Sequence, residues 1–127
     1  MKHSVNTVIM DEAGKYLLQM RNSNAGICDP LKWCFFGGGL EEEESPIVGA
    51  MRETREELGI AVPEDEFNVV GKLAYGTGVV YLVRLRRAIA WPDIVVQEGA
   101  GAGFFTKEEI LNINSTEQTK ALIRTFL

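Results

Sequence analysis

The order of elements along the sequence predicts an α/β fold, an α/β/α sandwich in which a mixed β-sheet lies between helices. Strand-like segments come first, one amphipathic helix follows, further strands come next, and two short helices end the chain. This mixture favours a sheet covered by helices over an all-α or all-β fold. With 127 residues, 46% of them hydrophobic, the chain is expected to form a single domain over residues 1–127.

Runs of β-branched and aromatic residues, bounded by turn residues, indicate the strands. They cover residues 4–10, 15–21, 33–36, 67–74, 79–86, 94–97 and 104–105. The first two form a predicted hairpin, and the fourth and fifth flank a turn. In residues 79–86 the side chains of Val80 and Leu82 alternate with those of Val83 and Leu85. Both faces of this strand are therefore apolar, and we expect it to be covered on both sides.

The main helix is predicted to follow Ser45. Apolar or amphipathic side chains recur there at i, i+3, i+4, i+7 and i+11, which makes a stripe that can be buried. The stripe consists of Ile47, Ala50, Met51, Thr54 and Leu58. Ser45 suits the N-cap, Pro46 suits the first helical position, and Gly59 suits the C-terminal stop.

Two more helices are predicted near the end of the sequence. Thr106-x-x-Glu109 and Ser115-x-x-Gln118 have the pattern of capping boxes, in which a hydroxyl and a carboxylate or amide satisfy the first backbone N–H groups. The last helix has one apolar side, and we expect that side to pack on the sheet.

Three glutamates share another face of the main helix. Glu53, Glu56 and Glu57 stand at i, i+3 and i+4, where like charges repel by roughly 0.2–0.5 kcal/mol per pair. Arg52 and Arg55 offset only part of this repulsion. A divalent cation such as Mg²⁺ can offset the rest, because it binds through carboxylates and substrate phosphates. The alternative is a solvated acidic face, which is common on helices.

The residues before this helix favour the metal interpretation. A short apolar strand leads into Gly37-Gly38-Gly39, and glycine allows the backbone to approach a ligand closely. The spacing resembles the Nudix box, G-x5-E-x7-R-E-U-x-E-E-x-G-U, in which U is a bulky apolar residue. The chain fills its fixed positions with Gly38, Glu44, Arg52, Glu53, Glu56, Glu57, Gly59 and Ile60. It departs from the pattern at Thr54, which is amphipathic. Phe36 and Glu43 also stand where many members have proline and glycine.

The resemblance implies a Nudix-type sandwich and a metal-dependent hydrolase. Its substrate would be a nucleoside diphosphate linked to another moiety, and water would attack phosphorus to split the diphosphate bond. A nucleoside triphosphate, including an oxidised purine nucleotide, is the expected substrate of a small member, with the monophosphate and pyrophosphate as products. The implied cofactor is Mg²⁺ or Mn²⁺. The implied metal ligands are Glu53, Glu56, Glu57, a backbone carbonyl at Gly37 or Gly38, and Glu98.

The resemblance also implies catalytic roles. Arg52 would orient a carboxylate, with Glu44 as its partner across the junction between loop and helix and with Glu56 one turn further on. The general base would be Glu53 or Glu98, because family members differ in where the base lies. The alternative for Glu98 is a solvent-exposed loop glutamate.

Substrate contacts are expected from Arg21, from the glycines Gly37, Gly38 and Gly39, and from Tyr75. The arginine that ends the second strand often contacts phosphate in the family, although a plain edge charge is the alternative. Tyr75 lies near the place where dinucleoside-polyphosphate enzymes carry a tyrosine.

Composition excludes some functions and leaves others open. The net charge of −5 argues against a nonspecific nucleic-acid binder, and no apolar run is long enough for a membrane span. We therefore expect a cytoplasmic protein with a small-molecule nucleotide substrate. A homodimer is a possible assembly. Three other functions stay open: a non-catalytic Nudix-like nucleotide-binding or regulatory domain, an RNA 5′-end pyrophosphohydrolase, and an isomerase.

Overall fold

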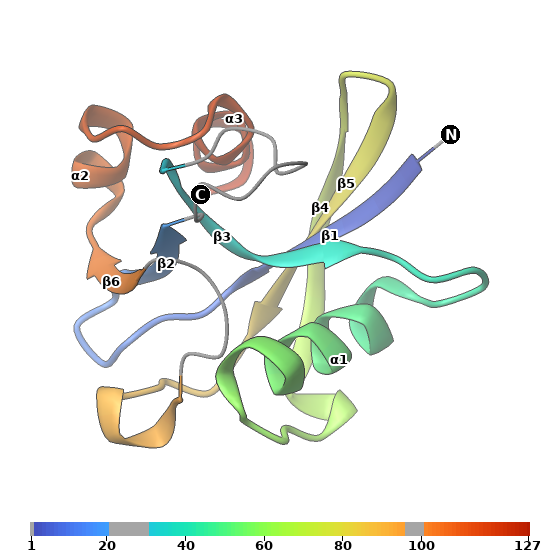
Figure 1. Ribbon diagram of the computed structural model, residues 1–127, viewed down its shortest axis with the longest axis horizontal. Coiled ribbons are helices and arrows are strands. Elements are labelled where there is room, and N and C mark those ends of the chain that lie inside the picture. Colours follow the sequence, from blue (N-terminus) through green and yellow to red (C-terminus); the bar gives the residue numbers. More distant parts are fainter. Residues whose placement is uncertain (1, 21–30, 96–100) are drawn as a thin grey trace.

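The computed structural model of the chain describes residues 2–20, 31–95 and 101–127. Its strands are β1 (Lys2–Val8), β2 (Tyr16–Met20), β3 (Trp33–Gly39), β4 (Phe67–Tyr75), β5 (Gly78–Leu85) and β6 (Gly101–Phe105). Its helices are α1 (Pro46–Leu58), α2 (Lys107–Asn112) and α3 (Glu117–Phe126), with short 3-10 turns η1 (Glu64–Glu66) and η2 (Trp91–Asp93). Within the described ranges, the strands form a six-stranded sheet in the order β4-β5-β1-β3-β2-β6 (Figure 1).

The sheet is mixed, as predicted. β1 and β5 are parallel, and the other neighbouring strands are antiparallel. β3 joins the two halves of the sheet, because its first residues pair with β2 and its last residues pair with β1. The end of β3 therefore lies beside β1 and leads directly into the loop before α1.

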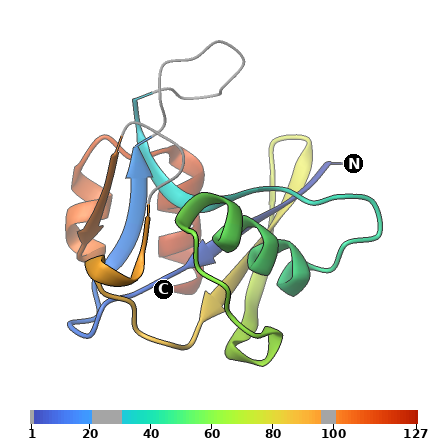
Figure 2. The same cartoon turned by 60° about the horizontal axis from the view of Figure 1, so that its bottom comes forward.

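Helices cover both faces of the sheet, which confirms the predicted sandwich (Figures 1 and 2). The core under α1 includes Val5, Leu17, Phe36, Ala50, Leu58, Val83 and Leu85. The core under α2 and α3 includes Val8, Leu18, Phe35, Val80, Leu82, Ile110, Leu122 and Ile123. β5 contributes alternate side chains to the two cores, so the prediction that this strand is covered on both sides is confirmed.

Local sequence signals account for the ends of α1. The hydroxyl of Ser45 accepts a hydrogen bond from Val48 N at 3.2 Å, and Pro46 is the first helical residue. Gly59 ends the helix in the left-handed conformation, with φ of 69°. Each of these three roles was predicted, because each depends on residues next to one another in the sequence.

Two predictions about the second half of the chain need correction. The N-cap of α3 is Thr116, because Ser115 Oγ instead donates to Ile110 O at 2.7 Å. Ile94 and Val95 do not form a strand; Val95 N donates to Leu58 O at 2.9 Å and so satisfies a carbonyl at the end of α1. The rest of that predicted strand lies outside the described residues. No helix in the described ranges is long and apolar enough to cross a membrane.

Glu43 has a left-handed backbone with φ of 61°, which explains why glycine suits this position. We expect Glu43→Gly to raise the free energy of unfolding by about 0.5–1 kcal/mol, because strain relief exceeds the entropy that glycine adds to the unfolded chain. Urea denaturation measures this. Glu42→Gly, at an exposed neighbour without a positive φ, is the control and should lower stability. A Glu43→Gly variant less stable than the parent would contradict the explanation.

Candidate active site

Arg52 lies in the middle of α1 and is the centre of a cluster of charged groups. Its Nε and Nη2 donate to the two oxygens of Glu44 at 2.8 and 2.9 Å, a bidentate contact of the strong kind. Its Nη1 donates to Glu53 Oε1 at 3.0 Å and to Glu56 Oε2 at 3.3 Å. Nη2 also donates to Gly39 O at 3.1 Å. The predicted pairing of Arg52 with Glu44 and Glu56 is therefore present.

Glu44 ties the loop to the helix. Its side chain is only 7% exposed, and its Oε1 also accepts from Glu41 N at 3.0 Å. The hydrogen bonds from Arg52 lower the pKa of Glu44 from 4.5 to about 2, although partial burial opposes the shift. The same contact raises the pKa of Arg52. Both groups therefore stay charged at neutral pH and hold the loop in one geometry.

Glu57 differs from the other helix glutamates because it is buried, with 3% of its surface exposed. Gly37 N donates to its Oε1 at 2.9 Å, and Gln19 Nε2 donates to its Oε2 at 3.3 Å. The sequence analysis missed Gln19. The sequence does carry a signal that Glu57 is buried. Ala50 belongs to the buried stripe, and Glu57, seven residues later, lies only about 20° from Ala50 around the helix.

The glycines are part of β3 and lie beneath the glutamates. The prediction that the strand ends at Phe36 is therefore wrong, because residues 37–39 continue the pairing with β1. A Cβ on Gly37 would collide with the carbonyl of Val5, and a Cβ on Gly38 would lie 2.6 Å from Glu53 Oε1. Only glycine fits at Gly37, and a side chain at residue 38 would displace the Glu53 carboxylate, so the backbone of β3 approaches the carboxylates closely.

Glu53 has a raised pKa. Burial is the main cause, and the charge of Glu56 adds to it, although hydrogen bonds with Arg52 and Glu57 oppose the rise. Glu56 is far more exposed, with 51% of its side chain in solvent. The surroundings of Glu53 therefore disfavour its charged form, compared with a carboxylate in water.

The donor set suits a hard divalent cation, since it consists of carboxylate and carbonyl oxygens. Within residues 2–20, 31–95 and 101–127, however, no three acidic, histidine or cysteine side chains converge on a point where a metal could bind. The expected convergence of Glu53, Glu56 and Glu57 is not found in this arrangement. In this arrangement Arg52 holds Glu53 and Glu56 by hydrogen bonds, while Glu57 accepts from the backbone of β3.

The other predicted site residues lie in different places. Tyr75 ends β4 and is 40% exposed in the tip of the β4–β5 hairpin, which lies away from α1 in both views (Figures 1 and 2). Arg21 and Glu98 lie outside the described residues. Gly39 contributes through its carbonyl, which accepts from Arg52.

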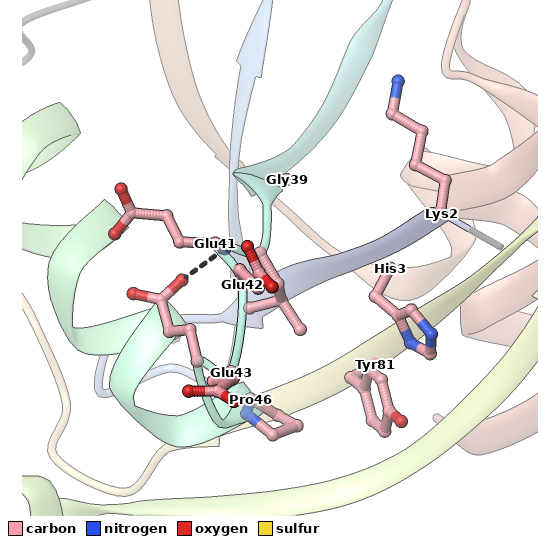
Figure 3. A pocket seen from close by; sticks show the side chains of 10 residues that line it. Lys2, His3, Gly39, Glu41, Glu42, Glu43, Pro46 and Tyr81 are labelled. Carbon is pink, nitrogen blue, oxygen red and sulfur yellow. Dashed lines mark hydrogen bonds between the residues drawn. The ribbon is translucent and has the colours of Figure 1, made fainter.

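A cavity of about 540 Å³ opens beside the loop between β3 and α1 (Figure 3). His3 and Tyr81, whose ring centroids are 6.0 Å apart, lie on one side of it. Glu42 and Glu43 lie on the loop side. Its lining includes Glu44 and none of the other box glutamates. The cavity therefore adjoins the Arg52 cluster through Gly39, Glu41 and Glu44, each of which contacts Arg52.

Comparison with known proteins agrees with these features. A sequence model of the NUDIX domain family matches residues 2–125. A MutT-like protein of Streptomyces ambofaciens is 33% identical over 110 residues, which cover 85% of this chain and 67% of that protein.

Two solved structures share the fold. One is a MutT protein from Methanosarcina mazei Go1, with a TM-score of 0.79, 22% identity and coverage of 96% of this chain and 88% of that chain. The other is a MutT NUDIX hydrolase from Burkholderia pseudomallei, with a TM-score of 0.78, 19% identity and coverage of 97% and 95%. Because the family match spans nearly the whole sequence and every fixed box position is filled, the chain belongs to the NUDIX domain family and is a Nudix pyrophosphohydrolase.

Proposed function

We propose that this protein hydrolyses a nucleoside triphosphate, including oxidised purine nucleotides, to the monophosphate and pyrophosphate with Mg²⁺ or Mn²⁺. The observation that carries the proposal is the placement of Glu53 and Glu57 against the backbone of Gly37 and Gly38. Carboxylates and a bare strand backbone at one place are suited to a cation and a polyphosphate chain. Members of the Nudix family act on small nucleotide substrates, which supports the choice of a nucleotide.

Nudix hydrolases generally use a divalent metal. In this chain the proposed ligands are Glu53, Glu56 and Glu57, with the carbonyl of Gly38 and, from outside the described residues, Glu98. A bound divalent cation supplies neutralisation of charge on the diphosphate oxygens and acidification of water. The fixed position of Glu57 and the tight fit of Glu53 over Gly38 would orient the ligands before substrate arrives.

The remaining roles fall to Arg52, Glu44 and the general base. Arg52 orients Glu53 and Glu56, and Glu44 in turn fixes Arg52 through both of its oxygens. Glu53 is suited to accept a proton from water, because burial raises its pKa above the ordinary value of a carboxyl group. Glu98 is the other candidate for the base. We propose Arg21 and Tyr75 as further substrate contacts, and a homodimer stays a prediction.

A nucleotide panel tests the proposed reaction. Nucleoside triphosphates, oxidised purine triphosphates, dinucleoside polyphosphates and a 5′-triphosphate RNA are each incubated with Mg²⁺ and with Mn²⁺, and pyrophosphate is measured against phosphate. We expect pyrophosphate from at least one triphosphate, and no turnover in EDTA. Phosphate as the sole product, or turnover of the RNA alone, would contradict the proposal.

Metal binding should also stabilise the fold by mass action. At a metal concentration about 100 times the dissociation constant, the free energy of unfolding should rise by about 2.7 kcal/mol, which corresponds to roughly 5–10 °C in Tm. Thermal denaturation with millimolar Mg²⁺ or Mn²⁺, with and without nucleotide, measures the shift. NaCl of equal ionic strength is the control. A Tm that neither metal changes would count against a metal site.

A further inference from the structure

Gln19 contacts Glu57 from the sheet side. It lies in β2, is 7% exposed, and donates through Nε2 to Glu57 Oε2 at 3.3 Å. The other carboxylate oxygen accepts from Gly37 N at 2.9 Å. Donors from two neighbouring strands, β2 and β3, therefore fix both oxygens of one carboxylate.

These two donors are neutral, which distinguishes them from Arg52. An amide donor fixes the geometry of a carboxylate and adds no charge to it. A carboxylate has about four acceptor positions, so the hydrogen bond from Gln19 does not by itself exclude a metal on the same group.

Burial of the Gln19 side chain is costly unless its amide has a hydrogen-bond partner. Leu17, two residues earlier in β2, packs in the apolar core under α1, and Leu18 packs in the core on the opposite face. Strand alternation therefore directs Gln19 to the α1 side, where a leucine or methionine would also fill space. A buried amide costs about 1–3 kcal/mol when it lacks a partner, so packing alone would favour an apolar residue here.

We propose that Gln19 is a positioning residue for the metal site: its amide holds the Glu57 carboxylate in the orientation that binds the cation. This inference rests on the proposed role of Glu57 as a metal ligand. Partners that orient metal ligands typically change metal affinity by 10–100-fold when they are removed. Loss of the Gln19 amide should therefore weaken metal binding more than it weakens the fold.

Mn²⁺ titration of the substrate-free protein tests the proposal, with free Mn²⁺ measured by electron paramagnetic resonance. Gln19→Met keeps a similar length and volume and removes the donor. We expect the dissociation constant for Mn²⁺ to rise by about 10–100-fold. The Mg²⁺ concentration for half-maximal rate should rise in parallel, while kcat at saturating metal changes less. A folded Gln19→Met protein with the parent's Mn²⁺ affinity overturns the inference.

Ser115→Ala is the matched control. It also removes one buried hydrogen bond, from Ser115 Oγ to Ile110 O in the connection between α2 and α3. It should lower the free energy of unfolding and leave the Mn²⁺ affinity unchanged. If Ser115→Ala weakened Mn²⁺ binding as much as Gln19→Met, the effect would be general destabilisation, and the inference would be wrong.

The parent protein separates this inference from the proposed function. If the parent binds no Mn²⁺, the metal proposal fails and the role of Gln19 fails with it. If the parent binds Mn²⁺ and Gln19→Met binds it equally well, only the role of Gln19 fails.

A measurement on the parent protein covers the case in which Gln19→Met does not fold. Saturating Mg²⁺ should shift the side-chain amide signals of Gln19 in NMR spectra more than those of Gln118, whose side chain pairs with Asn6. Equal or absent shifts at Gln19 contradict the proposal.

Discussion

Replacing Glu57 with glutamine should lower kcat by roughly 10³-fold while the protein stays folded. A metal stabilises transition-state charge by several kcal/mol, and each 1.4 kcal/mol is about tenfold in rate. Stability should change by no more than about 1 kcal/mol, because the amide of Gln19 can turn its oxygen toward the new NH₂ group. Steady-state kinetics at saturating Mg²⁺ and urea denaturation measure the two effects separately.

Glu64→Gln is the control for this variant. It makes the same change of charge at an exposed residue of η1, away from the Arg52 cluster. Its kcat should equal that of the parent within a factor of about two. A Glu57→Gln protein with near-parental kcat would remove Glu57 from the metal site.

Replacing Arg52 with methionine should affect both stability and activity. The change leaves Glu44, only 7% exposed, without the cation that lowers its pKa, and it releases Glu53, Glu56 and Gly39 O as well. Breaking an ion pair of this kind costs about 3 kcal/mol. We expect kcat to fall by at least about 10²-fold, because the carboxylates lose their orientation.

The pH dependence of stability should change in the same variant. A carboxylate with a depressed pKa stabilises the fold above its ordinary pKa of 4.5, and this contribution is lost as the pH falls toward about 2. The parent should therefore lose stability over this range, and Arg52→Met should lose less.

Arg87→Met is the control for the Arg52 variant. It breaks the exposed pair of Arg87 with Glu66, whose side chains are 47% and 30% exposed, and it should cost no more than about 1 kcal/mol. Equal losses of stability in the two variants would contradict a special role for Arg52.

The features that sequence predicted best are those set by neighbouring residues. The cap at Ser45, the stop at Gly59 and the buried stripe of α1 each follow from patterns within one helix. The contact of Arg52 with Glu44 was also predictable, although from the resemblance to the family's box and not from local rules.

The features that sequence did not predict depend on distant partners. Gly37 and its neighbours have little intrinsic preference for a strand, and they form one because β1 pairs with them. Glu57 lies at the border between the buried stripe and the acidic face, so its burial depends on the donors that β2 and β3 bring to it. Gln19 is distant in sequence from every box residue, and only the register of β2 places it beside Glu57.

The position of a bound metal tests the central claim most directly. Crystals grown with Mn²⁺ give anomalous diffraction that locates the ion without reference to the protein atoms. We predict a peak within about 2.5 Å of a carboxylate oxygen of Glu57 and of a carboxylate oxygen of Glu53 or Glu56. An ion bound elsewhere, with these three glutamates still in their present contacts, would contradict the account.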